Sequence, residues 1–313
     1  MTLRRVVAIV GPTASGKSAI ALDLAQRLGG EIVNADSRQV YRGMDIGTAK
    51  PTVAERRVAR HHLYDICDPA GSYSLALYRA QATATFDSLW AKGTFPWLVG
   101  GTGQYVWALL ENWSVPEVAP DDELRARLAA TAETDGHQAL HARLAAVDAT
   151  AAERIDSRNV RRVIRALEVY ERTGTPISEW QTKGEPDFEY LLFGIDVPRE
   201  ELDRRIDRRV EAMFESGFVD EVRLLLDSGV ARDAPAMSSI GYAEVARHLA
   251  GEIGLDDAIE LTKRATRRLA RRQAQWFRRE DPRITWVHDA DDIDLQANIF
   301  TGACTNVIRG ANR

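Results

Sequence analysis

Hydrophobic residues gather in short runs that alternate with longer helical patterns along much of the chain. The runs that we predict to be buried strands are Val6–Val10, Glu31–Ala35, Phe95–Val99 and Tyr190–Ile195, with Ile284–His288 as a candidate late strand. Each of the first three runs is followed by a loop with glycine or aspartate and then by a helical pattern. This alternation is typical of a parallel sheet with crossover helices, so it predicts an α/β fold.

The segment 116–187 interrupts this alternation. Strand-like runs disappear, and Ala, Leu, Arg and Glu dominate. A helix is predicted from Val160 past Tyr170, with Asp156-Ser157 as its cap and Gly174 near its end. We therefore predict a core built from 1–115 and 188–313, with C-terminal helices, and a helical insertion domain over 116–187. The leucines that mark the other insertion helices are Leu124, Leu128, Leu140 and Leu144.

Composition adds exclusions to this picture. The chain has 313 residues, of which 45% are hydrophobic and 28% charged, as in ordinary soluble globular proteins. No apolar run approaches the roughly 20 residues that cross a bilayer, so we expect no membrane contact. We also expect a cytoplasmic protein and a monomer. Cys67 and Cys304 lack the spacing of a zinc site or a disulfide scaffold. The net charge of −5 argues against a generic polyanion binder but allows a local basic surface.

The first predicted strand runs into a phosphate-loop pattern. The eight residues that fit G-x-x-x-x-G-K-[ST] are Gly11, Pro12, Thr13, Ala14, Ser15, Gly16, Lys17 and Ser18. An amphipathic helix is predicted next, over Ala19–Leu28. In this setting backbone N–H groups surround phosphate oxygens, the lysine adds a positive charge and the serine holds Mg²⁺. A glycine turn that merely connects a strand to a helix is the alternative, but the full context favours a site for a diphosphate or triphosphate.

A nucleotide kinase or NTPase is the ordinary interpretation of such a loop, with an aspartate at a later strand end supporting Mg²⁺. Here the strand Phe95–Val99 ends in Gly100–Gly103 without an acidic residue. The aspartate at a strand end is instead Asp36. For Gly100–Gly103 itself, a left-handed glycine turn is an equal alternative to a functional loop.

Eight segments of the sequence resemble the tRNA dimethylallyltransferase family in their residues, order and spacing, and together they extend over nearly the whole chain. This family resembles P-loop kinases in its core but uses the loop for the pyrophosphate of a prenyl donor. The resemblance implies transfer of a dimethylallyl group from dimethylallyl diphosphate to the N6 amine of the adenosine 3′-adjacent to the anticodon, which gives N6-isopentenyladenosine and pyrophosphate. The matching segments are Gly11–Ser18, Asp36–Tyr41, Gly43–Pro51, His61–Asp65, Gly100–Gly103, Arg165–Val169, Ile240–Tyr242 and Arg271–Gln273.

The resemblance also implies catalytic roles. Asp36 matches the family's general base, and a carboxylate can take the proton that the adenine amine loses on alkylation. A Mg²⁺-supporting aspartate of the kinase type is the alternative. Lys17, with Mg²⁺ on Ser18 and with Thr13, would stabilise the leaving pyrophosphate. Arg209 matches a pyrophosphate-facing arginine of the family, although Arg205 and Arg208 in the same run remain open.

The resemblance implies a tRNA-facing surface as well, in contact with the anticodon loop. Two basic clusters support it, one on the insertion helix (Arg158, Arg161, Arg162 and Arg165) and one on the basic residues between Lys263 and Arg279. Each cluster alone favours a solvated helix face with local salt bridges, but the two together beside a phosphate loop favour an RNA cradle. The family often has leucine where this chain has Gln104. The residues predicted to contact tRNA are Asp36, Ser37, Arg38, Gln39, Thr102, Arg125, Arg161, Arg162, Val163, Ile164 and Arg165.

Three rival functions remain open at this stage. One is a related prenyltransferase that uses free adenine nucleotides, against which the basic helices and the insertion count. The others are a small-molecule P-loop kinase and a non-catalytic RNA-binding ATPase.

Overall fold

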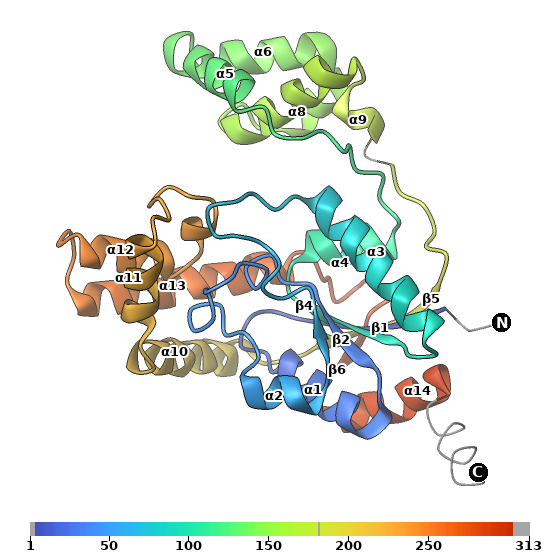
Figure 1. The fold of residues 1–313 in the computed structure, drawn as a ribbon. Helices are drawn as coiled ribbons and strands as arrows, with labels where there is room; N and C mark the ends of the chain where they lie inside the picture. The colour runs from blue at the N-terminus through green and yellow to red at the C-terminus, as the bar shows by residue number, and fades with distance from the viewer. Residues whose placement is uncertain (1–3, 181, 303–313) are drawn as a thin grey trace, which may run out of the picture. The chain divides into compact units, whose positions relative to one another are not determined.

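The computed structural model describes residues 4–180 and 182–302, so Cys304 lies outside the described residues. Six strands form one sheet in the order β3-β2-β4-β1-β5-β6, and every pairing is parallel (Figure 1). All five strands predicted from the sequence are confirmed within one residue at each end. The strands are β1 (Arg5–Val10), β2 (Glu31–Asn34), β3 (His61–His62), β4 (Pro96–Gly100), β5 (Glu189–Ile195) and β6 (Thr285–Val287).

Two compact units divide the chain. Unit 1 contains the chain up to Ser74, Tyr78–Leu110 and the chain from Asp187 onward, and unit 2 contains Glu111–Pro186 with Leu75–Leu77. Unit 2 starts before residue 116, because the two connecting segments pair with each other. The Gly184 N–H donates to the Glu111 carbonyl, and the Ser114 N–H donates to the Thr182 carbonyl.

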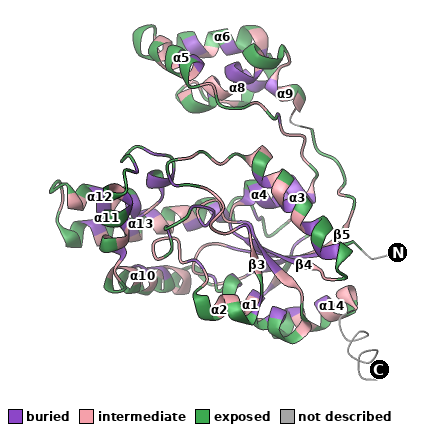
Figure 2. Ribbon diagram, viewed as in Figure 1, coloured by how far each residue is buried: buried purple, intermediate pink, exposed green. Residues whose placement is uncertain are grey.

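The hydrophobic core of unit 1 lies between the sheet and the helices that cover it. Strand residues such as Val7, Ile9 and Trp97 pack with Leu24 of α1 (Lys17–Leu28) and Ile293 of α14 (Asp291–Thr301), and all five are almost completely buried. Figure 2 shows the central strands mostly in the colour of buried residues. Burial of such apolar surface is the main stabilising contribution to the fold. The helices close to the sheet are α1 (Lys17–Leu28), α2 (Val53–Val58), α3 (Leu75–Ala91), α4 (Gly103–Leu110) and α14 (Asp291–Thr301).

A second helical layer of unit 1 fixes the loop that follows β2. Glu221 accepts hydrogen bonds from the backbone N–H groups of Asp45, Ile46 and Gly47 at 2.8, 2.7 and 3.1 Å, and from the Tyr242 hydroxyl at 2.6 Å. The loop is therefore held by a carboxylate as well as by apolar packing. This layer consists of α10 (Arg199–Glu215), α11 (Phe218–Asp227), η1 (Ala236–Ser238), α12 (Tyr242–Leu249) and α13 (Leu255–Ala274).

Unit 2 is helical, and the four leucines predicted to mark its helices are buried in its core. Gly174 ends α8 in the left-handed conformation, as predicted. The predicted cap at Asp156-Ser157 is wrong. The side chain of Asn159 caps the helix, while Asp156 Oδ1 accepts the Arg158 N–H in a turn before it. The helices are α5 (Asp122–Thr134), α6 (His137–Val147), α7 (Ala149–Arg154), α8 (Val160–Thr173) and α9 (Ile177–Trp180).

Within the described ranges, every helix is too short or too polar to cross a membrane.

Candidate active site

The phosphate loop connects β1 to α1 and folds back on its own backbone. The Pro12 carbonyl accepts hydrogen bonds from the Ser15 N–H and from Lys17 Nζ, each at 3.2 Å. Gly16 has φ 97°, a backbone conformation that residues other than glycine rarely adopt. Ala14 has a left-handed backbone conformation, with φ 62°. The loop is thus tightly wound, and α1 begins at Lys17 with its N-terminal N–H groups at the loop. This geometry suits an anion at the helix N-terminus.

Asp36, Lys17 and Arg209 are the residues predicted to be catalytic, and Asp36 lies close enough to affect the pKa of both Lys17 and Arg209. The Lys17 side chain is buried, with 8% of the residue exposed. Burial lowers the pKa of Lys17 from 10.5 to about 8; the Asp36 carboxylate opposes this change, and the Arg209 guanidinium adds to it. Burial likewise lowers the pKa of Arg209, again against the effect of Asp36. An anionic ligand would relieve the repulsion between the two cations.

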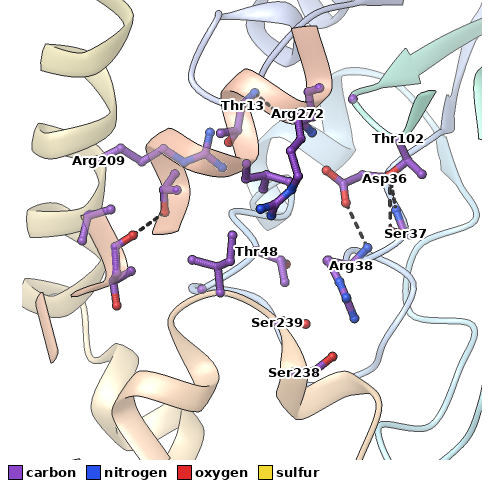
Figure 3. Close-up of a pocket in the computed structure, with 18 of the residues that line it drawn as sticks. Thr13, Asp36, Ser37, Arg38, Thr48, Thr102, Arg209, Ser238, Ser239 and Arg272 are labelled. Carbon is purple, nitrogen blue, oxygen red and sulfur yellow. Dashed lines mark hydrogen bonds between the residues drawn. The ribbon is translucent and has the colours of Figure 1, made fainter. Parts of the chain in front are cut away.

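A cavity of about 360 Å³ opens beside these residues. Figure 3 shows Thr13, Asp36, Thr102 and Arg209 around it. Another part of its wall is apolar, with side chains from α10, α11, α13 and the segments that precede α12 and follow α13. The main apolar side chains are Val210, Met213, Phe218, Ile240, Leu269 and Trp276. The cavity therefore combines a charged region with an apolar one.

Adjacent parallel strands bring Asp36 and Thr102 together. Asp36 follows β2 and Thr102 follows β4, and β2 pairs with β4. Asp36 Oδ1 accepts the Arg38 N–H at 2.9 Å. Thr102 Oγ1 accepts the Ser37 N–H at 3.0 Å, and the Thr102 N–H donates to the Ala35 carbonyl at 3.1 Å. These bonds fix the carboxylate and the hydroxyl on one side of the cavity.

Gln39 and Arg38, both predicted to contact tRNA, have protein partners. Gln39 Nε2 donates to the carbonyls of Thr48 and Ala49 at 3.0 and 3.1 Å, and the residue is buried. Arg38 lines the cavity and donates to the Pro235 carbonyl at 3.1 Å. The Gln39 side chain therefore supports the loop that forms the cavity wall, whereas Arg38 remains on its edge.

The glycines of Gly100–Gly103 allow close packing. The alternative interpretation of this segment as a left-handed glycine turn is wrong. None of these glycines has a positive φ. A Cβ on Gly100 would lie 2.1 Å from the Ala35 carbonyl oxygen, and one on Gly103 would lie 2.2 Å from Cγ of Trp276. The turn thus lies directly against the residue that follows β2 on one side and the segment that follows α13 on the other.

The run of arginines on α10 separates into different environments. Arg209 lines the cavity. Arg205 pairs with Glu201 at 2.9 Å and lies 3.4 Å from the Ser15 carbonyl. Arg208 is exposed and 3.6 Å from Glu201. The geometry therefore favours Arg209 as the arginine that faces a ligand in the cavity.

Arg272 and Gln273 are among the cavity residues that were not predicted from the sequence to line the site. Arg272 was grouped with the basic face of its helix, but it lines the cavity, and Figure 3 shows its side chain pointing into it. Gln273 also lines the cavity and is buried. The only sequence signal for either was their place in the family-like segment Arg271–Gln273, because helical spacing alone groups Arg272 with Arg264 and Arg268.

Ser18 is the residue predicted to hold Mg²⁺, and its environment fits a weakly protein-bound metal. It lies exposed in the first turn of α1, beside a smaller cavity of about 260 Å³. In the part of the chain that the structure describes, no three His, Cys, Asp or Glu residues cluster as metal ligands. Mg²⁺ commonly takes one or two protein ligands together with phosphate oxygens and water. One hydroxyl beside a phosphate loop fits that pattern.

The predicted tRNA contacts of unit 2 fall into two groups. Arg125 and Arg165 bind Glu168, which is 0% exposed: Arg125 makes bonds of 2.7 and 2.9 Å, and Arg165 one of 2.5 Å. Burial would raise the pKa of Glu168, but these bonds and the Asp121 N–H outweigh it and lower the pKa. Arg161 and Arg162 are exposed.

Val163 and Ile164 do not share one environment. We predicted that Val163 contacts tRNA, but it is 0% exposed in the core of unit 2. This prediction is corrected: the valine positions its helix and does not touch the RNA. Ile164 is partly buried against the same core. A side chain without accessible surface cannot touch RNA.

Comparisons with known proteins cover nearly the whole chain. The family model described as IPP transferase matches residues 39–280, and the one described as isopentenyl transferase matches residues 4–66. A tRNA dimethylallyltransferase from Roseiflexus sp. is 51% identical over 292 residues, which are 93% of this chain and 96% of that protein. One from Herpetosiphon aurantiacus is 50% identical over 294 residues, which are 94% and 93% of the two chains.

Solved structures are similar as well. The full-length tRNA isopentenylpyrophosphate transferase of Bacillus halodurans is 39% identical with a TM-score of 0.68, and the match covers 99% of this chain and 100% of that one. A eukaryotic dimethylallyltransferase acting on tRNA is 26% identical with a TM-score of 0.78, and the match covers 99% and 80%. Together with the parallel sheet, these matches confirm the predicted P-loop NTPase-like α/β fold class.

Proposed function

The chain belongs to the IPP transferase family, and we propose that it transfers a dimethylallyl group from dimethylallyl diphosphate to tRNA. The acceptor is the N6 amine of the adenosine 3′-adjacent to the anticodon. The observation that carries this proposal is the cavity in which a phosphate loop, a carboxylate and an apolar wall meet. The phosphate loop can bind a diphosphate, the carboxylate can accept a proton from an amine, and the apolar wall can contact a prenyl chain.

The donor diphosphate binds at the phosphate loop. Its charge is matched by Lys17, Arg209 and the N-terminal N–H groups of α1, while the hydroxyl of Thr13 lines the same cavity. Magnesium bound by Ser18 and the diphosphate would neutralise charge on the leaving oxygens. Fixed cations stabilise most strongly the state in which that charge develops. The loop therefore lowers the barrier to breaking the allylic C–O bond.

The acceptor amine is activated at the wall of the cavity that carries Asp36 and Thr102. A bond forms between adenosine N6 and C1 of the dimethylallyl group, and the bond between C1 and the diphosphate oxygen breaks. Pyrophosphate leaves with the bonding pair, and the N6 proton passes to Asp36. Asp36 and Thr102 lie on the same wall, so the hydroxyl of Thr102 can orient the adenine while the carboxylate accepts the proton.

The tRNA-facing surface is proposed to include the insertion helix. Arg161 and Arg162 on α8 are exposed and available for phosphate contacts, whereas Arg125 and Arg165 have their guanidinium groups oriented by Glu168. Enzymes that modify a base commonly take it out of its stack, and an unpaired loop base is the least costly to move. We propose the anticodon loop as the target, with a cytoplasmic monomer as the working state.

Labelled dimethylallyl diphosphate tests the proposal directly. The protein is incubated with Mg²⁺ and tRNA, AMP or ATP, and each acceptor is separated and counted. Label on tRNA supports the proposal. Label on AMP or ATP would instead show a prenyltransferase of free nucleotides, and the absence of any prenyl product would leave a kinase or an RNA-binding ATPase.

A further inference from the structure

Gln273 is a buried amide in the last turn of helix α13, whose second half is rich in arginine. The residue is 6% exposed, and its Oε1 accepts the backbone N–H of Thr13 at 2.8 Å. Burying an amide costs free energy unless it is hydrogen-bonded. The bond ties the phosphate loop to a helix that is distant in sequence.

The other end of the same amide lies against the second glycine turn. A Cβ on Gly101 would lie 2.4 Å from Gln273 Nε2 and 3.0 Å from the Gly11 carbonyl oxygen. A side chain at position 101 would therefore have to displace the amide from its place between the two loops. The residue that follows Gly101 is Thr102, which binds the backbone of Ala35 and Ser37 on either side of Asp36.

These contacts form one continuous frame across the cavity. It runs from Thr13 through Gln273 to the glycine turn, and from Thr102 to the segment that carries Asp36. We propose that Gln273 is a positioning residue for prenyl transfer, setting the separation between the loop that holds the donor and the wall that carries the base. This inference rests on the proposed function.

Such a spacer matters because transfer needs C1 of the donor and N6 of the acceptor about 3–3.5 Å apart and in line. A displacement of about 1 Å at the reacting atoms can cost roughly 10²-fold in rate. The docking of α13 has other support: the Trp107 indole N–H donates to the Trp276 carbonyl at 3.0 Å, and Ala265 and Ala270 are buried. Loss of the Gln273 bond should therefore shift the phosphate loop without detaching the helix.

Two substitutions separate the hydrogen bond from the bulk of the side chain. Gln273→Met keeps the length but removes the acceptor, whereas Gln273→Glu keeps an acceptor oxygen for the Thr13 N–H. Gln275→Met is the matched control, because Gln275 is exposed two residues further along. The measurements are the single-turnover transfer rate at saturating donor and tRNA, tRNA affinity, pyrophosphate affinity by calorimetry, and Tm.

We expect Gln273→Met to transfer about 10²-fold more slowly at unchanged tRNA affinity and nearly unchanged Tm. Pyrophosphate affinity should fall about tenfold, because the loop is no longer held in its binding conformation. Gln273→Glu should recover most of the transfer rate, while its added negative charge weakens pyrophosphate binding. Gln275→Met should match the wild type in all four measurements.

A wild-type transfer rate for Gln273→Met overturns the inference. The inference is also overturned if the Met and Glu variants lose the same amount of transfer rate and both have a lowered Tm. That result would show that Gln273 only stabilises the fold. Failure of the proposed function is distinguishable, because the wild type itself would then leave tRNA unlabelled. In that case unchanged pyrophosphate affinity in Gln273→Met would still overturn the role of the amide in fixing the loop.

Discussion

Lys17→Met should stabilise the folded protein at neutral pH. The lysine is charged but buried, and burial lowers its pKa to about 8 from the 10.5 of an unperturbed side chain. At about 1.36 kcal/mol per pKa unit, holding the ammonium in the fold at pH 7 costs on the order of 3 kcal/mol. Methionine keeps the apolar stem and loses a hydrogen bond to the Pro12 carbonyl, worth about 1 kcal/mol. The expected net gain is about 2 kcal/mol.

The pH dependence follows from the same shift. Between pH 8 and pH 10.5 the unfolded chain binds more protons than the folded protein at this site, so wild-type stability rises with pH across that window. Below about pH 8 the full cost of burying the charge is present. The advantage of Lys17→Met should therefore be largest at pH 7 and nearly vanish by pH 10, where the wild-type lysine is largely neutral in the fold.

Urea unfolding of both proteins at pH 7 and pH 10, without diphosphate, measures this difference. Comparing the variant with the wild type at each pH cancels the other titrating groups. A variant that is less stable than the wild type at pH 7, or a difference that does not change with pH, would refute the argument. Such a result would mean that Lys17 is solvated in the folded protein.

The other predictions concern roles in the reaction. Asp36→Asn should lower the single-turnover rate about 10²–10⁴-fold at nearly unchanged donor and tRNA affinity, and a near wild-type rate removes Asp36 as the base. Arg209→Ala should weaken pyrophosphate binding in calorimetry at least tenfold, while Arg208→Ala should not; equal effects would contradict the assignment. Arg161→Ala should reduce the slope of log K for tRNA against log [salt] by roughly 0.7–0.9, and an unchanged slope would show a merely solvated arginine.

The strands were predictable because a strand buried on both faces needs a continuous apolar run, as in Val6–Val10. The strand β3 was not, since it consists of two histidines and pairs only at the sheet edge. The phosphate loop was predictable because its chemistry depends on residues that are consecutive in sequence. The same holds for Asp36, which stands directly after a strand end.

The rest of the site depends on contacts between distant segments. Gln273 reaches Thr13 across 260 positions of sequence, and no local pattern distinguishes it from an exposed glutamine. From the sequence, Arg165 was predicted to be available for tRNA, but its guanidinium group is hydrogen-bonded to the buried carboxylate of Glu168. Val163 was grouped with arginines by its position in a segment, although helical periodicity turns it toward the core of unit 2.

Transfer of label to one adenosine of tRNA tests the central claim most directly. The protein is incubated with labelled dimethylallyl diphosphate and two otherwise identical tRNA transcripts, one with adenosine 3′-adjacent to the anticodon and one with guanosine there. The account predicts label as N6-isopentenyladenosine in the first transcript and none in the second. Equal labelling of both transcripts, or labelling of neither, would contradict it.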